Sequence, residues 1–327
     1  MLYAKIFKLR SKMKRFSLTP LLLIIFLISG CNISPTKPDL DDESKNIPWQ
    51  MISGKIAYSR TEMAPGLIGY LFIIDGNSKR VNLVKKAERR QFTNLSWKND
   101  GSTLTFSDFD DSRMLWQLLN IFPDGSNLVN IYPGDAHCNY PAWSTNGKLA
   151  YFYNGVEHLG EIRIDGSTFF YNGKESCNQS RPAWSPDCKS LVISIADEKA
   201  QVSFIKVNLL DKSVTPLLKA EGNGGEEIFD APIYSPNGKQ IAFHKYGSSI
   251  GDNEEIWIMN SDGSNPEKLT SGNIDYSPAW SPDGQYIAFC RTLDVRMGIT
   301  KIFIIGLNDR SIIQVTENVA RYLTWIQ

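Results

Sequence analysis

The sequence predicts an all-β fold, a six-bladed β-propeller closed by pairing the C-terminal strand with strands of the N-terminal blade. A short turn recurs six times, and its tip falls at Gly54, Gly101, Gly147, Cys188, Gly238 and Gly284. Successive tips are 47, 46, 41, 50 and 46 residues apart. This period is typical of propeller blades, in which each repeat forms one four-stranded sheet that is too small to be stable alone.

The clearest copy of the repeat is the stretch 277–289, in which two apolar segments flank the turn Ser281-Pro282-Asp283-Gly284. Pro282 fixes φ at the first central position, Asp283 favours the second, and Gly284 accepts a positive φ. The turn therefore predicts two short antiparallel strands in every repeat.

An aromatic residue precedes every turn except the first, at Trp97, Trp143, Trp184, Tyr234 and Trp280. The missing aromatic is at the other end of the chain, at Trp325. If residues 323–326 form the innermost strand of the blade whose other strands lie within residues 54–84, one sheet joins both ends of the chain. Such closure removes the free sheet edges that an open array would expose.

The first thirty residues have the layout of an export signal, with six basic residues and no acid before the apolar run 21–28. The apolar run is short for a membrane span. Ile28-Ser29-Gly30-Cys31 resembles the bacterial lipobox, which implies cleavage before Cys31 and a lipid on that cysteine. The alternative is an ordinary cleaved signal with an incidental cysteine. A separate question is the start of the chain, because Met13 followed by Lys14 and Arg15 would still supply a basic region.

We therefore expect three segments: a lipoprotein signal peptide over residues 1–30, a lipidated Cys31 and flexible tether over 31–51, and the propeller over 52–327. Prolines and an acidic cluster predict the tether. Removing residues 1–30 leaves 29 basic and 35 acidic residues, and this acidic balance argues against nucleic acid as a partner.

The Trp-Ser-Pro-Asp-Gly turn, the following Ile-Ala-Phe strand and the later Asp-Gly turns resemble the WD-like propeller repeats of TolB and its relatives. This resemblance covers residues 52–327 and is specific for the fold. It implies a periplasmic protein of the Tol–Pal envelope machinery. TolB proteins also carry an amino-terminal α/β domain, for which this chain leaves no room between Cys31 and the first repeat.

Cysteine and histidine positions suggest one crosslink and no metal site. In repeat register, Cys138 and Cys177 fall in the loops that enter adjacent blades, and an exported protein meets oxidising conditions. A Cys138–Cys177 disulfide is one interpretation, and two separate thiols is the other. The histidines His137, His158 and His244 belong to different repeat positions, so we expect no metal and no cofactor.

The candidate binding residues lie four to six positions before the blade aromatics, where the innermost strands begin at the mouth of the channel. They are His137, Asn139, Gln179, Asp230, Asp275 and Arg321. Polar groups that converge from different blades can bind a ligand, although a water-filled channel needs a polar lining in any case.

We expect a cell-envelope lipoprotein that binds an unidentified envelope protein or peptide and contacts the membrane only through its lipid. This hypothesis makes the chain a binding scaffold and not an enzyme. The alternative is a polysaccharide lyase or hydrolase that acts in the propeller channel.

Overall fold

The computed structural model describes residues 44, 46–62, 67–110, 113–154, 160–170, 176–177, 181–196, 202–219, 227–247 and 254–326. The chain divides into the units Met1–Lys37 and Pro38–Gln327, and every described residue belongs to the second. Within these ranges the regular structure is β-strand apart from one short 3-10 helix, η1 (Trp49–Met51). No helix in the described part has the length and apolar character that crossing a bilayer requires. The predicted all-β class is confirmed.

Three sheets have four antiparallel strands each. The first has the order β25 (Arg321–Ile326), β1 (Lys55–Glu62), β2 (Ile68–Asp75) and β3 (Arg80–Glu88). The second contains β4 (Phe92–Trp97), β5 (Leu104–Asp110), β6 (Leu115–Ile121) and β7 (Val129–Asn130). The third contains β8 (His137–Trp143), β9 (Leu149–Asn154), β10 (Glu161–Ile164) and β11 (Ser167–Phe170).

The remaining strands form two larger groups. One comprises β12 (Ser176–Cys177), β13 (Ala183–Trp184), β14 (Ser190–Ala196), β15 (Val202–Asn208) and β16 (Val214–Leu218). The other begins with β17 (Glu227–Tyr234), β18 (Gln240–Gly247), β19 (Glu254–Asn260) and β20 (Glu267–Lys268). It continues with β21 (Ile274–Trp280), β22 (Tyr286–Asp294), β23 (Ile299–Gly306) and β24 (Ile312–Gln314). A single parallel pair, Glu254 with Ile274, joins the two halves of this last group.

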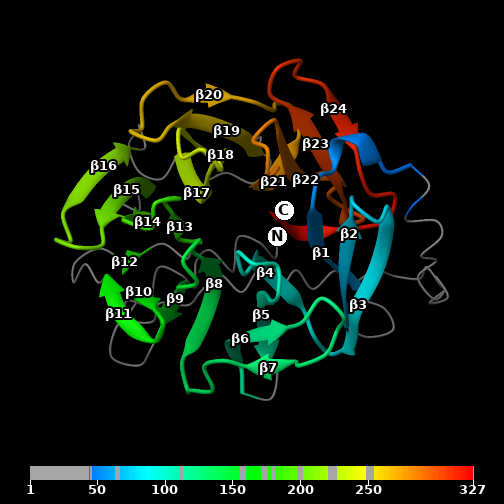
Figure 1. Ribbon diagram of the computed structural model, residues 1–327, viewed down its shortest axis with the longest axis horizontal. Coiled ribbons are helices and arrows are strands. Elements are labelled where there is room, and N and C mark those ends of the chain that lie inside the picture. The colour runs from blue at the N-terminus through cyan, green and yellow to red at the C-terminus, as the bar shows by residue number, and fades with distance from the viewer. Residues whose placement is uncertain are drawn as a thin grey trace, which may run out of the picture. The chain divides into compact units, whose positions relative to one another are not determined.

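Within the second unit, the sheets lie side by side around a common centre, with β4, β8, β13, β17 and β21 near it (Figure 1). Each of these innermost strands contacts the next: β4 contacts β8, β8 contacts β13, β13 contacts β17, and β17 contacts β21. β25 contacts both β21 and β4. β25, the last strand of the chain, therefore lies between β21 and β4, which are the last and the first of the other innermost strands.

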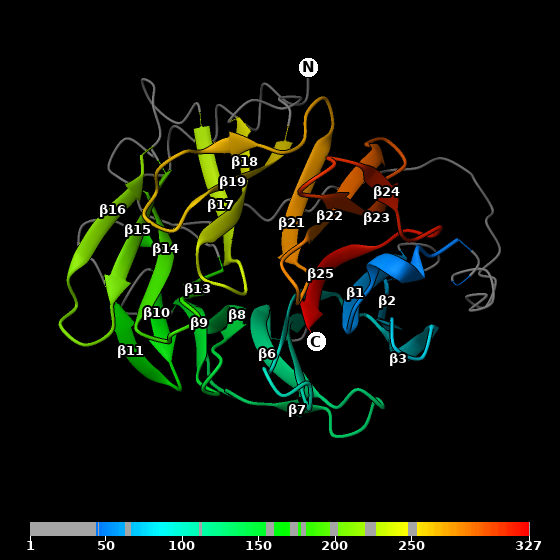
Figure 2. The same cartoon turned by 45° about the horizontal axis from the view of Figure 1, so that its top comes forward.

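β25 pairs with β1, as the displaced aromatic predicted. Trp325 is opposite Ile56 in this antiparallel pair, and the Trp325 indole N–H donates to the Ser53 carbonyl at 2.6 Å. Figure 2 shows β25 running between β21 and β1. Residues more than 260 positions apart in the sequence thus share one sheet.

The turn chemistry is as the sequence predicted. The Ser281 hydroxyl donates to Asp283 Oδ1 at 2.6 Å, and the same carboxylate oxygen accepts from the Gln285 N–H at 3.0 Å. Gly284 has a φ of 70°. Cys188, which replaces glycine in its repeat, adopts the same left-handed conformation with a φ of 56°, a strained choice for a residue with a Cβ.

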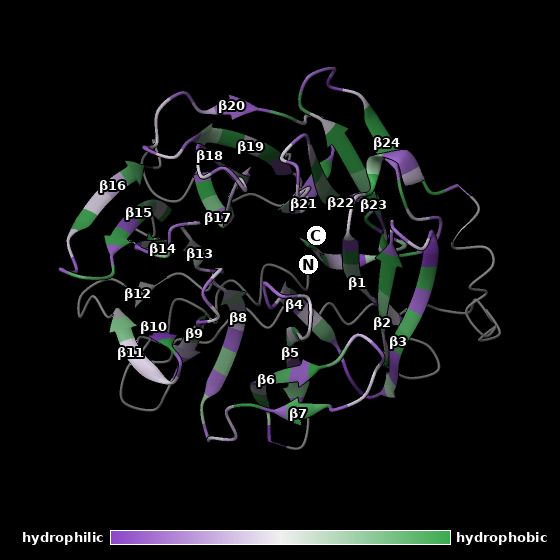
Figure 3. Cartoon of the chain, in the orientation of Figure 1, coloured by the Kyte–Doolittle hydropathy of each residue, from purple (hydrophilic) through white to green (hydrophobic). Residues whose placement is uncertain are grey.

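Apolar side chains fill each junction between neighbouring sheets. Leu71 of β2 packs with Phe92 and Phe106 of the second sheet, and Cys290 of β22 packs with Tyr58 and Leu323 of the first. Comparable clusters lie at the other four junctions. In Figure 3 the inner strand β2 is largely hydrophobic, whereas the outer strand β20 is hydrophilic. Most of the stabilisation therefore comes from burial between sheets.

Trp325→Ala tests the dependence of the fold on β25. Trp325 is only 9% exposed, and truncating a buried tryptophan costs about 3–5 kcal/mol. We expect the free energy of unfolding in urea to fall by about this amount. The control is Leu210→Ala, because Leu210 is 94% exposed and its truncation should change stability by less than about 0.5 kcal/mol. Equal effects of the two substitutions would contradict a structural role for β25.

Candidate functional site

A cavity of about 430 Å³ lies where the innermost strands end. All six aromatic residues of the repeat line it: Trp97, Trp143, Trp184, Tyr234, Trp280 and Trp325. Prolines add rigid apolar walls, at Pro182, Pro186, Pro232, Pro236 and Pro282. The cavity thus draws its lining from every sheet of the second unit. Most of the lining residues are aromatic, proline or aliphatic, and polar atoms contribute nearly half of the lining surface.

Most of the indole N–H groups around the cavity are already bonded. Trp184 donates to the Ala142 carbonyl at 2.9 Å and Trp280 donates to the Ile233 carbonyl at 3.1 Å. Trp143 donates to the Thr105 hydroxyl at 2.7 Å. The indole N–H of Trp97 differs, because it is buried without a partner among the described residues. A ligand with an acceptor group could satisfy it.

Arg181 is the only charged side chain among the described residues that line this cavity. One guanidinium nitrogen donates to the Leu95 carbonyl at 2.9 Å. Burial lowers the pKa of Arg181 to about 10, and the Asp230 carboxylate opposes that shift. The group therefore remains a cation at neutral pH, with donors left for a ligand.

A β-bulge recurs three residues before the blade aromatic in five of the innermost strands. At this position five residues that are not glycine have a positive φ, namely Asn94, Tyr140, Ala231, Ser277 and Tyr322. The strand register breaks at the same place in each of these strands. Residues in this conformation carry strain that the surrounding structure must offset, and such positions often accompany functional sites.

Asp230 lies among tyrosines that come from three sheets. Burial raises the pKa of Tyr140 and of Tyr246, and the Asp230 carboxylate raises both further. Burial likewise raises the pKa of Tyr322, to which Asp230 also contributes. These phenols are therefore neutral at physiological pH and can donate hydrogen bonds. The Asp230 Oδ1 accepts from the Ala231 N–H at 2.6 Å, which holds the bulge.

The five candidates that the structure describes lie within strands near the opposite end from the cavity, and none of these five lines it. Asp230 alone among them connects to it, through its interaction with Arg181. Arg181 was not predicted, because it is three positions before Trp184 and the candidates were expected four to six positions before the aromatic. Gln179 and Cys31 lie outside the described residues.

Asp275 has a different setting from the one we expected. Its carboxylate is fully buried and accepts two hydrogen bonds from Arg291, at 2.7 and 2.8 Å. The Arg291 guanidinium lies 5.2 Å from the ring centres of both Phe289 and Phe303. This arrangement occupies Asp275 within its own sheet, so we omit it from the binding groups.

His137, Asn139 and Arg321 also have partners in the protein. His137 Nδ1 accepts from the Trp116 N–H at 3.2 Å, and burial lowers the pKa of His137. Asn139 Oδ1 accepts from Asn94 Nδ2 at 2.9 Å. Arg321 donates to the Gly298 carbonyl at 3.2 Å, while its buried Nε has no partner among the described residues.

The predicted disulfide stays a prediction. Cys138 lies in β8 and Cys177 in β12, not in loops as expected. The Cys138 side chain packs with Leu118 and Tyr151, and burial raises the pKa of its thiol to about 11. The side chain of Cys177 lies outside the described residues. Among the described residues, no three acids, histidines or cysteines are grouped in a way that could hold a metal.

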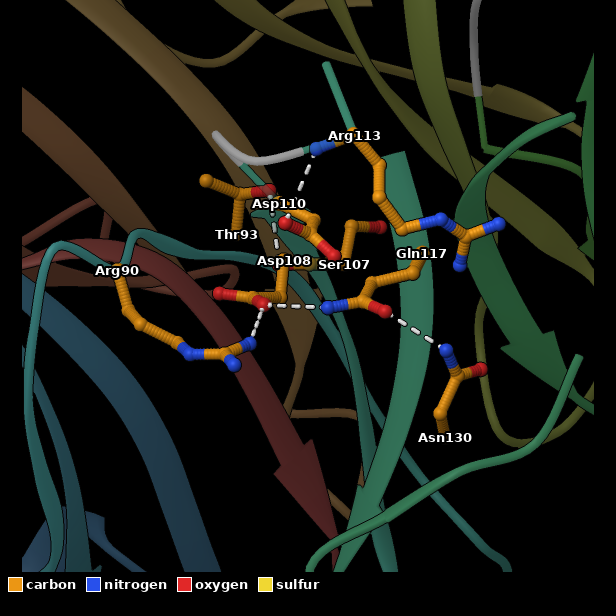
Figure 4. Close-up of polar contacts among 8 residues, drawn as sticks. All are labelled: Arg90, Thr93, Ser107, Asp108, Asp110, Arg113, Gln117 and Asn130. Atoms are coloured by element: carbon orange, nitrogen blue, oxygen red, sulfur yellow. Dashed lines mark hydrogen bonds and ion pairs between the residues drawn. The ribbon is translucent and has the colours of Figure 1, made fainter. Parts of the chain in front are cut away.

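A polar network around Asp108 lies away from the cavity (Figure 4). Asp108 is fully buried, and its Oδ2 accepts from Arg90 and, at 3.0 Å, from Gln117. Gln117 in turn accepts from Asn130 at 2.7 Å. Asp108 Oδ1 has no partner among the described residues. Burial raises the pKa of Asp108, although Gln117 and Arg90 oppose the shift.

The fold is that of a β-propeller of the TolB kind. TolB from Acinetobacter baumannii superposes with a TM-score of 0.67 and 19% identity over 84% of this chain and 66% of that one. A TolB homologue from Agrobacterium tumefaciens gives a TM-score of 0.60 and 18% identity over 83% of this chain and 94% of that one.

Sequence similarity is confined to part of the chain. Dipeptidyl-peptidase 5 of Porphyromonas endodontalis is 33% identical over 93 residues, which are 27% of this chain and 14% of that protein. The Tol-Pal system protein TolB of Anaeromyxobacter dehalogenans is 32% identical over 100 residues, 30% of this chain and 21% of that protein. The chain thus spans about a fifth or less of these relatives. No family model matches it.

Asp108→Asn tests the buried carboxyl. A carboxyl with a raised pKa in the folded protein gives stability that is present below its unfolded pKa and is lost as pH rises through its folded pKa. Asparagine does not ionise, so the stability of the variant relative to the parent should increase between about pH 4 and pH 7, as measured by urea unfolding.

The control for this prediction is Asp124→Asn, in the turn after β6. Hydrogen bonds from Ser126 lower the pKa of Asp124, so its stabilising effect is present at neutral pH and is lost in acid. The relative stability of the control variant should therefore change with pH in the opposite direction. The same trend in both variants would show that Asp108 is not destabilised by its burial.

Proposed function

We propose that this chain is an exported, lipid-anchored protein of the bacterial cell envelope whose propeller binds a protein or peptide partner. The observation that carries this proposal is the cavity to which every innermost strand contributes an aromatic residue. Its volume of about 430 Å³ lies in the range of ligand-binding pockets and could hold a short extended segment of polypeptide. Its lining of apolar residues with a few polar groups is also typical of ligand sites.

The propeller has six blades in a closed ring in this proposal. The six aromatics, the six clusters between neighbouring sheets and the pairing of β25 with β1 support that count. A closed ring fixes the geometry of the cavity, since each wall is held by two neighbours. Such a rigid lining lowers the entropic cost of binding.

Binding fits the chemistry of the cavity better than catalysis does. Tryptophan and proline walls suit extended peptide, and the Trp97 N–H and the Arg181 guanidinium are hydrogen-bond donors that a partner could use. Both favour an acceptor such as a backbone carbonyl or carboxylate. General acid–base chemistry needs a positioned pair of titratable groups, and no such pair lines this cavity among the described residues. We therefore propose a scaffold and not an enzyme.

Two observations support an envelope location. The chain resembles a protein whose name is Tol-Pal system protein TolB, and its first thirty-one residues have the pattern of an export signal that ends in a lipobox at Cys31. A lipid on Cys31 would provide membrane affinity from its buried methylenes. In this proposal the tether after Cys31 keeps the propeller within reach of envelope proteins. It ends before Ile47 and Met51, because both side chains are buried in the core cluster of the first sheet.

Arg181→Met tests the cavity as the binding site. Loss of a charged hydrogen bond to the partner should weaken binding about tenfold or more, measured as protein recovered from an envelope extract on immobilised propeller. The control is Lys239→Met, on a turn outside the cavity. Undiminished capture by the Arg181 variant would contradict the proposal. Glycan cleavage that is lost in Asp230→Asn would favour the lyase alternative instead.

Cys31→Ala tests the anchor. Cells that express the parent chain should incorporate a palmitate analogue into this protein, whereas the variant should remain unlabelled because its acceptor thiol is gone. The control is Cys188→Ala, which leaves the lipobox intact and should be labelled like the parent. Labelling that persists in Cys31→Ala would show that the lipobox assignment is wrong.

A further inference from the structure

A second cavity, of about 510 Å³, lies between the sheet containing β14 and the sheet containing β18. We name it the lysine cleft, after Lys189 and Lys206, which line it. The other lining residues are Ser185, Pro186, Asp187, Ser190, Asn208, Ser213, Thr215, Tyr234, Asn237, Gly238 and Ser261. Nearly all of them are polar residues, whereas the lining of the central cavity consists mostly of aromatic, proline and aliphatic residues.

The lysine cleft is at the one blade whose aromatic is tyrosine. At the neighbouring blades, Trp184 and Trp280 each bond a carbonyl of the preceding sheet through the indole N–H. A tyrosine at position 234 has no such group. Its hydroxyl is instead buried beside Ser190, where it makes no hydrogen bond of ordinary geometry. A buried donor without a partner is costly unless a ligand or water satisfies it.

The turns of the cleft use several of its acceptors and leave its two asparagine NH₂ groups as donors. Asn208 Oδ1 accepts from the Leu210 N–H at 2.8 Å, and Asn237 Oδ1 accepts from the Lys239 N–H at 2.9 Å. Asp187 Oδ1 accepts from the Ser185 hydroxyl at 2.6 Å. Both asparagine NH₂ groups remain, since they donate to no described residue. The cleft therefore favours a ligand that is rich in acceptors.

The charges around the cleft restrict the chemical class of ligand that it can bind. The Lys206 ammonium group forms no ion pair or hydrogen bond with any residue of the described part, although the carboxylates of Asp187 and Asp262 are near enough to sense it. Two lysines against these acids leave little net positive charge. A polyanion such as nucleic acid needs more basic groups than that. A small ligand with one anionic group and several hydroxyls matches the cleft better.

We propose that the lysine cleft binds an acidic saccharide. Lys206 holds its anionic group, and the Tyr234 hydroxyl, the amides of Asn208 and Asn237, and the hydroxyls of Ser213 and Ser261 donate to its other oxygens. This site is separate from the central cavity, and it does not depend on the protein partner proposed above.

Calorimetric titration of the whole chain with galacturonic acid, glucose 6-phosphate, glucose and inorganic phosphate tests the proposal. We expect both acidic sugars to bind, and glucose and phosphate to bind about tenfold more weakly, because each lacks one set of contacts. Glucose that binds as tightly as the acidic sugars, or phosphate that binds as tightly as glucose 6-phosphate, would overturn the proposal. Absence of binding by the acidic sugars would overturn it as well.

Variants locate the site. Lys206→Met should weaken the acidic sugars about tenfold and leave glucose unchanged, and Tyr234→Phe, which keeps the buried ring, should weaken them several-fold. The matched control is Lys239→Met, at the turn position equivalent to Lys189 in the next blade and outside the cleft. Thermal unfolding checks that each variant is folded. Unchanged affinity in Lys206→Met or in Tyr234→Phe, or an equal loss in Lys239→Met, would refute the assignment.

Discussion

The pairing of β25 with β1 is the interaction on which the rest of this structure depends. It is reinforced by side chains, since Ser59 donates to the Arg321 carbonyl at 3.0 Å and Trp325 donates to the Ser53 carbonyl. Without β25, the first sheet would lose its innermost strand and β1 would become an exposed edge. β25 also brings Tyr322 toward Asp230 and places Trp325 in the wall of the central cavity. Fold and site therefore depend on one contact between distant parts of the chain.

Local chemistry explains why so much of the fold could be predicted from the sequence. The turn at Gly284 and its siblings is specified by four adjacent residues, and the displaced Trp325 indicated which strand joins the first sheet. The bulges could not be predicted in this way. Tyrosine is not a residue type that favours a positive φ, so neighbouring sheets and not local preference hold Tyr140 and Tyr322 there. Arg181 was missed because it is three positions before Trp184, one position outside the window in which candidates were expected.

Variation at one register position shows how equivalent strands acquire different polar groups. Asp108 is opposite Phe92, Lys245 is opposite Phe229, and Arg291 is opposite Asp275. Of these three pairs, only Arg291 and Asp275 carry opposite charges, so Arg291 bonds Asp275 within one sheet. Asp108 instead accepts from Arg90, which lies in the connection between β3 and β4. The pairing of Asp275 with Arg291 and of Asp108 with Arg90 could not be predicted from the sequence, because it depends on the strand register and on the neighbouring loops. The apolar residues buried elsewhere in each sheet offset the cost of a buried charge at this position.

The two proposed sites use the repeat in opposite ways. The central cavity is built from what the blades share, the aromatic and proline of the turn, so its shape follows from the fold and its selectivity must come from unique residues such as Arg181. The lysine cleft arises where one blade departs from the pattern, because tyrosine in place of tryptophan leaves a buried hydroxyl between two sheets. A replacement in one repeat can thus create a site without disturbing the ring, since neighbouring junctions keep their own apolar clusters. Deviations from the repeat, more than the repeat itself, are therefore where individual function should be sought in this chain.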